Sequence, residues 1–286
     1  MMNYYKIIPV QQGIYRITSL ENVFMELLVG TEKALLIDTG YGFGDIRQVV
    51  QSITDKPLYI VNTHGHCDHT GGNFRFDEEV YIADADVGLL KRHNTTEFRA
   101  RSVVQAEHVL DWETGREACG LPEDFDRDAY LAGGTGTIRS LWEGMTFDLG
   151  GKTLRAVATP GHTHGGISLF LEEERWLYAG DAANMFLWLF DDDATDKATY
   201  LKTLDKILEL APERLYGGHA PQPFSLEDVK MFQRAALEAD YDRGIPFFTP
   251  IMPDCKDIRV CILGDKTMAD IGKPGFYAIV LDSSRR

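Results

Sequence analysis

The sequence is poor in cysteine and contains no long apolar run. Its four cysteines show neither CxxC pairing nor dense spacing, so they predict reduced thiols rather than a disulfide framework. The longest suspicious apolar stretch, Met185 to Phe190, is far shorter than the roughly 18 residues that a membrane-spanning helix requires. The N-terminus has no charged region followed by a long apolar stretch, which argues against a secretory signal. We therefore expect a cytoplasmic protein without a membrane segment.

Basic residues are also scarce relative to acidic ones. The chain has 29 Lys and Arg residues against 44 Asp and Glu residues, which gives a formal net charge of -15. An acidic surface of this kind repels nucleic-acid phosphates and anionic lipids. The charge balance therefore favours a small-molecule substrate, with no nucleic-acid partner and no membrane partner. Composition leaves a homodimer open.

With 286 residues, 44% of them hydrophobic, the chain can fill the core of one large α/β domain spanning residues 1–286. Apolar runs at 23–29, 34–37 and 58–61 predict strands, and the helical spacing of apolar residues within 44–53 predicts a helix. Charged helical segments and glycines from about 84 to 144 predict an insertion of helices and loops, with a lid over a site as one interpretation. Strand patterns resume at residue 146 and return in the tail after residue 247.

The central motif is His64-Gly65-His66-Cys67-Asp68-His69, which follows the apolar run at 58–61. It places four side chains of metal-ligand type within six residues. In a tight loop they cannot all point the same way, so they are suited to two adjacent metals. Gly65 allows a sharp turn, and neutral imidazole suits Zn, Fe, Mn or Ni. A lone histidine would more often be a surface or core residue, but this spacing favours a metal site.

This motif resembles the signature of the metallo-β-lactamase superfamily, and further motifs match that family in order. These are Thr159-Pro160-Gly161-His162-Thr163, Ala179-Gly180-Asp181 and Gly217-Gly218-His219, with Leu36-Ile37-Asp38-Thr39-Gly40 preceding them. The resemblance covers roughly residues 10 to 220 and leaves the tail and the insertion uncovered. It implies an α/β (α+β) fold, a four-layer αββα sandwich of two mixed β-sheets with flanking helices and metals at one edge.

The resemblance also implies which side chains bind metal. His64, His66 and His162 would hold one ion, Asp68, His69 and His219 would hold a second, and Asp181 would bridge both. A shared carboxylate relieves the repulsion between two dications that lie a few ångströms apart. Two zinc ions are the expected cofactors, with Fe or Mn as alternatives. Cys67 lies between ligands and is expected to point away from the metals.

The implied activity is that of a dinuclear metallohydrolase in which a metal-bridged hydroxide attacks the substrate. Asp68 would act catalytically by orienting this nucleophile or accepting its proton. The leading hypothesis is cleavage of a small-molecule ester, thioester, lactone or amide. The alternatives are a phosphodiesterase or nuclease of the same fold, or a non-hydrolytic iron enzyme that is sulfur dioxygenase-like or flavodiiron-like.

Two departures narrow the branch of the family. The commonest class B β-lactamases carry Cys where this chain has Asp181, and flavodiiron proteins usually carry Glu where it has His66 and need a fused flavin domain. The pattern is similar to the glyoxalase II-like, lactonase-like and phosphodiesterase-like branches.

Several other residues are open to two interpretations. Asp38 either fixes a ligand imidazole or caps a turn or helix. His164 is expected to be structural rather than catalytic, and His93 and His108 are expected to be ordinary surface or packing residues. The segment 185–190 either packs in the core or an oligomer contact, or lines an apolar substrate pocket. The acidic run 191–193 is expected to be solvated surface.

Overall fold

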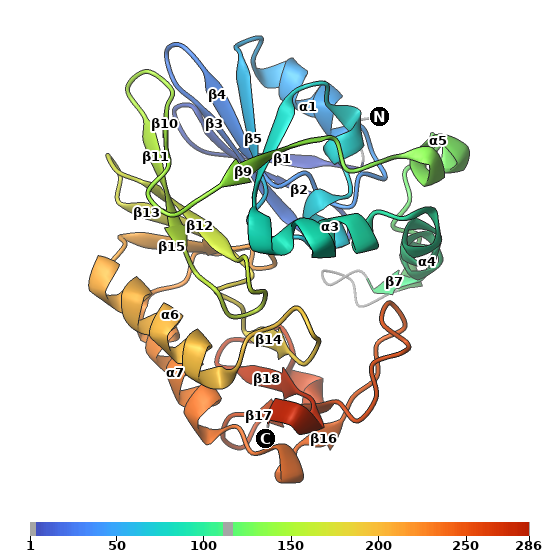
Figure 1. The fold of residues 1–286 in the computed structure, drawn as a ribbon, viewed down its shortest axis with the longest axis vertical. Helices are drawn as coiled ribbons and strands as arrows, with labels where there is room; N and C mark the ends of the chain where they lie inside the picture. Colours follow the sequence, from blue (N-terminus) through green and yellow to red (C-terminus); the bar gives the residue numbers. More distant parts are fainter. Residues whose placement is uncertain (1–3, 111–116, 286) are drawn as a thin grey trace.

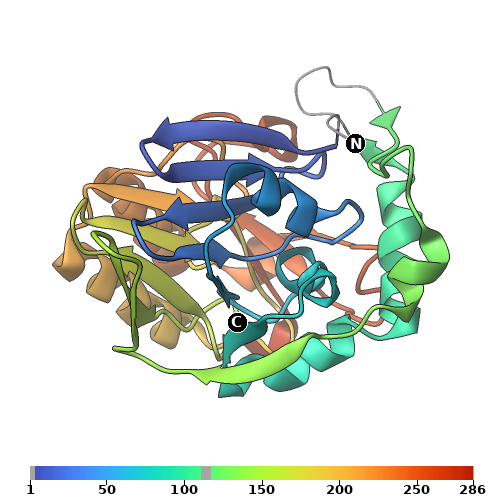
Figure 2. The ribbon, with the colours of Figure 1, turned by 90° about the horizontal axis from the view of Figure 1, so that it is seen from above.

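The computed structural model describes residues 4–110 and 117–285 of the chain. Within these ranges, two β-sheets pack against each other between layers of helices (Figure 1, Figure 2). The first sheet has the strand order β1-β2-β3-β4-β5-β6-β9, and the second has the order β10-β11-β12-β13-β15. Each sheet contains both parallel and antiparallel pairs, so the expected αββα sandwich of two mixed sheets is confirmed.

The strands of the first sheet are β1 (Lys6–Gln11), β2 (Ile14–Thr18), β3 (Phe24–Val29), β4 (Ala34–Ile37), β5 (Leu58–Val61), β6 (Glu79–Ala83) and β9 (Thr137–Leu141). Those of the second sheet are β10 (Thr146–Asp148), β11 (Thr153–Ala158), β12 (Ile167–Leu171), β13 (Trp176–Gly180) and β15 (Arg214–Gly217).

The strand β4 is an example of a strand that is buried on both faces of the first sheet. Leu35 and Ile37 join the apolar core between the sheets, whereas Ala34 and Leu36 join the core beneath the outer helices. Successive side chains of a strand point to opposite faces, so a strand covered on both sides reads as a continuous apolar run. The apolar run at 34–37 therefore reflects a central strand of the sandwich.

Helices cover the outer face of each sheet. The first sheet packs against α1 (Ile46–Ile53), α4 (Thr96–Ala106) and α5 (Arg127–Ala132), and the second against α6 (Lys197–Leu210) and α7 (Leu226–Glu238). A capping box of Ser225 and Asp228 stabilises the start of α7. Among the described residues, no helix is both long and apolar enough to cross a membrane.

The tail forms a third sheet with the strand that follows Asp181. Its order is β14-β18-β17-β16, with β14 running parallel to β18. Leu187, Leu189 and Ile279 of this sheet join the core around α6 and α7. The bounds are β14 (Phe186–Leu189), β16 (Ile245–Pro246), β17 (Arg259–Ile262) and β18 (Ala278–Leu281). The segment 185–190 is therefore largely a packing element.

The segment 84–144 contains helices on one side of the molecule (Figure 1) and one strand of the main sheet. Besides α4 and α5, it includes α3 (Val87–His93) and a short pair of strands, β7 (Val109–Leu110) and β8 (Glu117–Ala118). Its last element, β9, pairs in parallel with β6 and forms one edge of the first sheet. The shorter helices of the chain are α2 (Cys67–Thr70), η1 (Asn73–Arg75), η2 (Asp84–Asp86), η3 (Tyr241–Arg243), η4 (Met268–Asp270) and η5 (Ser283–Arg285).

Candidate metal centre

All seven predicted ligands lie in the segments that follow strand ends at one edge of the sandwich, five of them in loops and two, Asp68 and His69, in the short helix α2. The motif at 64–69 follows β5, and His162 follows β11. Asp181 follows β13, and His219 follows β15, which runs parallel to β13. The carboxyl ends of parallel strands meet at the same sheet edge, so residues far apart in the chain converge there.

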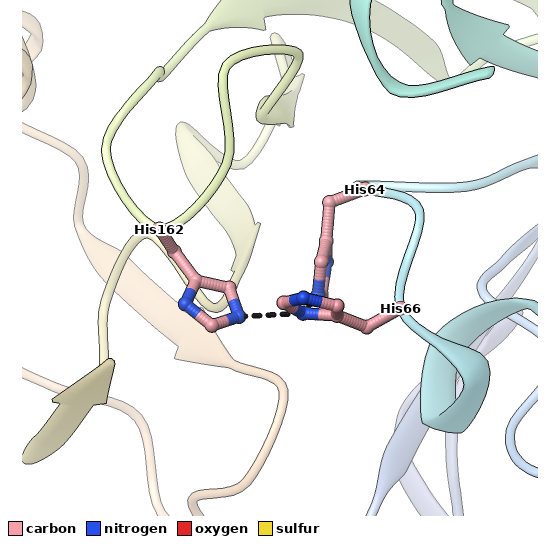
Figure 3. A group of neighbouring side chains, drawn as sticks. All are labelled: His64, His66 and His162. Atoms are coloured by element: carbon pink, nitrogen blue, oxygen red, sulfur yellow. Dashed lines mark hydrogen bonds between the residues drawn. The ribbon is translucent and has the colours of Figure 1, made fainter. Parts of the chain in front are cut away.

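Three histidines form the first group. Nε2 of His64 lies 3.0 Å from Nδ1 of His66, and Nε2 of His162 lies 2.8 Å from the same atom (Figure 3). All three side chains are buried. The nitrogens of three imidazoles on one zinc ion lie about 3.3 Å apart, given zinc–nitrogen bonds near 2.0 Å. The observed spacing is close to that of a single metal site.

The second group contains Asp68, His69 and His219. Nε2 of His219 lies 3.3 Å from Oδ2 of Asp68 and 3.3 Å from Nε2 of His69. Asp181 lies between the two groups, with Oδ2 3.3 Å from Nε2 of His219 and 3.6 Å from Nε2 of His162. Each group offers converging ligand atoms that could hold a metal ion, and Asp181 reaches both.

The outward nitrogens of the histidines have their own partners. Nδ1 of His162 donates to the carbonyl oxygen of Trp188 at 2.8 Å, and Nδ1 of His69 lies 2.8 Å from Oδ2 of Asp38. When Nδ1 carries the proton, the lone pair of Nε2 faces the centre of the site. Lone pairs that face one another repel, and a cation between them removes the repulsion. The donor set therefore fits metal ions.

An orphaned carboxylate oxygen supports the same conclusion. Among the described residues, Oδ1 of Asp181 is buried and has no hydrogen-bond partner, and Nε2 of His69 lies 3.5 Å from it. A buried polar atom without a partner costs free energy, so such an atom in a native fold calls for an explanation. A bound cation beside Asp181 supplies one.

The electrostatics divide the site into two halves. Burial, reinforced by neighbouring histidines, lowers the pKa of His64 well below 6.5 and lowers that of His162 to about 4. Burial also acts to lower the pKa of His219, but the carboxylates of Asp181 and Asp68 outweigh it and raise that pKa well above 6.5. His64 and His162 are therefore neutral imidazoles at pH 7, whereas burial of His66 is outweighed by Asp191, which raises the pKa of that imidazole. The carboxylates of the second group attract positive charge.

The structure resolves the two interpretations of Asp38. Its Oδ1 accepts from the backbone N–H of Thr63, and its Oδ2 accepts from the Thr63 hydroxyl at 2.8 Å, beside Nδ1 of His69. The residue that caps α1 is Asp45 instead. Asp38 therefore fixes the imidazole of His69, a predicted ligand, and does not begin a helix.

His164 and Cys67, which stand near predicted ligands in the sequence, lie outside the two ligand groups. His164 is exposed, and its backbone N–H donates to the carbonyl oxygen of Asp193. Cys67 is buried, and its sulfur lies 3.8 Å from the hydroxyl of Ser102 on α4, away from the ligand groups. Both observations agree with the interpretations drawn from the sequence.

Three residues near the site were not expected there. Oδ2 of Asp191 lies 3.8 Å from Nε2 of His66, so the acidic run is not simply solvated surface. The buried ring of His93 stacks on that of His66, with 5.0 Å between centroids. Asp86 accepts hydrogen bonds from both ligand loops, at Gly65 and Gly165. No local motif marks these residues, since tertiary contacts alone bring them to the ligands.

Comparisons with known proteins agree with this geometry. The family model described as the metallo-beta-lactamase superfamily matches residues 21–219. Acyl-coenzyme A thioesterase MBLAC2 of Gallus gallus is 26% identical, over 82% of this chain and 84% of that protein. An atrochrysone carboxyl ACP thioesterase of Aspergillus fumigatus is 27% identical, over 66% of this chain and 48% of that protein. A metallo-beta-lactamase from Pontibacter korlensis is a structural neighbour with a TM-score of 0.57 and 16% identity, covering 82% of this chain and 99% of that one.

Proposed function

Because the chain belongs to the metallo-beta-lactamase superfamily, we propose that it is a dinuclear metallohydrolase that cleaves a small-molecule thioester. One observation carries the proposal: Asp181 lies within 3.6 Å of histidine nitrogens from both ligand groups. A carboxylate in this position is suited to bridge two cations, and two adjacent cations are a recurrent device for hydrolysis.

The ligands are those that the sequence predicts. His64, His66 and His162 would hold one cation, Asp68, His69 and His219 the other, and Asp181 both. Imidazole and carboxylate ligands suit zinc, and Fe or Mn accept the same donors. When bound, two such cations lower the pKa of a shared water and polarise the carbonyl oxygen of the substrate.

Asp68 is the proposed catalytic residue because of its charge and its place. Burial acts to raise its pKa, but the neighbouring His69 and His219 outweigh burial and hold the pKa well below 3.8. Asp68 is therefore a carboxylate at pH 7, and its side chain keeps some exposure at the site. In that state it can accept a hydrogen bond from the attacking water and orient it toward the carbonyl carbon.

A thioester is favoured over the ester, lactone and amide by the relatives and by the leaving group. Two relatives from distant organisms are named as thioesterases. Hydrolysis forms a C–O bond, breaks the C–S bond and releases a carboxylate and a thiolate. A thiol has a pKa near 8.5, so the thiolate departs without a proton donor. His93 is a poor donor in any case, because burial lowers its pKa to about 3.

The test is metal analysis followed by thiol release. The full chain, purified without added metal, should contain about two equivalents of a divalent metal, and it should release thiol from acyl-coenzyme A substrates. Asp181→Ala should lose turnover by about a hundredfold or more and lower the metal content. His108→Ala is the matched control, since this histidine is exposed and outside both ligand groups.

Metal analysis, together with assays of phosphodiester cleavage and of oxygen consumption, separates the competing functions. Cleavage of phosphodiester substrates, with no thioesterase activity, would replace this proposal by a phosphodiesterase. A single bound iron with oxygen consumption would point to a non-hydrolytic iron enzyme. Normal thioester turnover in Asp181→Ala would contradict the proposed role of the bridging carboxylate.

A further inference from the structure

The carboxylate of Asp86 joins the two loops that carry the first ligand group. Oδ2 accepts from the backbone N–H of Gly65 at 3.0 Å, and Oδ1 accepts from the backbone N–H of Gly165 at 2.6 Å. Gly65 stands between His64 and His66, and Gly165 follows His162 by three residues. Asp86 is 1% exposed, so this contact is shielded from water.

Both contacts depend on glycine. A Cβ atom built on Gly165 would lie 2.6 Å from Oδ1 of Asp86. A Cβ atom built on Gly65 would lie 2.8 Å from the carbonyl oxygen of Asp86 and 2.9 Å from Leu89. These distances are shorter than van der Waals contact, so any side chain would push the loops away from Asp86. The three residues form a junction with no spare room.

Helix α3 holds Asp86 in place. Asp86 ends η2 and precedes α3, whose Leu89 and Leu90 are buried. At the far end of α3, Arg92 pairs with Asp193, whose carbonyl oxygen accepts from the N–H of His164. The loop that follows His162 is therefore tied to α3 at both ends of the helix.

A carboxylate is suited to this junction in a way that an amide is not. An ionised Asp only accepts hydrogen bonds, so each oxygen can serve one N–H group. An Asn in the same place would turn its NH₂ group toward one of the two backbone donors. Burial raises the pKa of Asp86 above 3.8, so the fold keeps this acid at an energetic cost that the two N–H groups partly offset.

We propose that Asp86 is a positioning residue that sets the separation of the two loops and thereby the geometry of His64, His66 and His162. The inference rests on the proposed metal centre and extends it to a residue that is not a ligand. Through these bonds Asp86 contacts Gly65, between His64 and His66, and Gly165, beyond His162, whereas Asp68 and His69 lie on α2. Its loss should therefore weaken one metal position and spare the one formed by Asp68, His69 and His219.

The test is titration of the metal-free full chain with zinc, for the wild type and for Asp86→Asn. The wild type should bind two equivalents tightly. The variant should keep one tight equivalent and bind the other about ten- to a hundredfold more weakly. Cobalt titration should show the same division in the visible spectrum. Asp84→Asn is the matched control, because Asp84 lies on the same turn, is exposed, and its carboxylate accepts from the hydroxyl of Ser140 and not from Gly65 or Gly165.

A second variant guards against misfolding. Gly165→Ala crowds Asp86 without removing its charge and should give the same selective loss, with an unchanged circular dichroism spectrum. Two equally tight equivalents in both variants would overturn the inference while leaving the proposed function intact. Equal weakening of both equivalents would also overturn it, because a general loss of stability would then explain the data. If the wild type binds no zinc, iron or manganese, the proposed function itself fails.

Discussion

Oδ2 of Asp38 lies 2.8 Å from Nδ1 of His69, and both side chains are buried. Asp38 holds this position with a backbone φ of 61°, a left-handed conformation that Asp tolerates better than most residues. Its carboxylate accepts a hydrogen bond from the Nδ1–H group, so Nε2 of His69 is the nitrogen left to bind a metal ion in the second ligand group. Asp38, which directly follows β4, thus selects the tautomer of His69, a proposed ligand in the segment after β5.

Asp38→Asn should weaken the second metal position. The amide can donate to Nδ1 of His69, which favours the tautomer with the proton on Nε2 and removes the inward lone pair. Metal affinity at that position should fall by about ten- to a hundredfold, measured by zinc titration. Asp55→Asn, at an exposed position, is the control and should bind as the wild type does. Unchanged affinity in Asp38→Asn would show that the carboxylate does not set the tautomer.

Arg16 should be essential for stability because it pairs with the buried Glu26 and fixes the loop that carries His219. Its Nε donates to Glu26 at 2.8 Å, and its remaining nitrogens donate to the carbonyl oxygens of Gly217, Ala220 and Pro221. Arg16→Met leaves Glu26 buried and unpaired, which should lower the free energy of unfolding by about 3–5 kcal/mol. Urea denaturation measures this loss.

The double variant Arg16→Met/Glu26→Met separates the two roles of Arg16. Removing Glu26 eliminates the unpaired charge, so part of the lost stability should return. The three carbonyl oxygens still lack their donor, so recovery should be incomplete. A double variant that is less stable than Arg16→Met would contradict this account.

The central strands could be predicted because burial on both faces leaves a strong local pattern. The runs at 34–37 and 58–61 match β4 and β5, and the spacing within 44–53 matches α1, which spans Ile46–Ile53. The strand β9 was harder to detect because it lies at a sheet edge, where four of its five residues are exposed or half-buried. Without a buried face, its residues carry little apolar periodicity.

The sequence marks the proposed ligand residues, but it does not mark the residues that hold the ligand loops in place. The proposed ligands lie in short motifs with fixed spacing, so the sequence alone marks them as candidates. Asp86 and Asp191 act through contacts with loops that are far away in the chain, and an isolated Asp before a helix resembles an ordinary cap. Only the folded structure distinguishes these residues from surface acids.

Zinc binding should release protons and become tighter as the pH rises from about 7 to 9. Burial acts to lower the pKa of His69, but Asp68 and Asp38 outweigh it and raise the pKa to about 9 in the metal-free protein. At pH 7.5 the imidazole of His69 is therefore doubly protonated, and a metal ion must displace the proton on Nε2. Calorimetry in buffers with different ionisation enthalpies measures the number of protons released.

Removal of the metals should also destabilise the fold. A ligand that binds only the native state adds about 4 kcal/mol when its concentration is a thousand times its Kd. Excess EDTA should therefore lower the melting temperature by several degrees, and added zinc should restore it. A melting temperature that is insensitive to both would argue against a metal centre in the native protein.

Glu21 should make stability fall as the pH rises from about 4.5 to 7. Its carboxylate accepts from the hydroxyl of Tyr4 at 2.9 Å, and burial raises the pKa of Glu21 from 4.5 to about 7. Between these values the unfolded chain has lost the proton that the folded chain still holds, so the folded state binds more protons. The free energy of unfolding must then decrease with rising pH across this window.

Glu21→Gln tests this assignment, because the amide oxygen can still accept from Tyr4 but does not titrate. Urea denaturation of both proteins from pH 5 to pH 8 gives the difference in their free energies of unfolding. The variant should gain stability relative to the wild type as the pH rises, and the gain should level off above pH 7. Other titrating groups cancel in this difference because both proteins share them. A difference that stays constant across the range would mean that Glu21 ionises at the same pH in the folded and unfolded states.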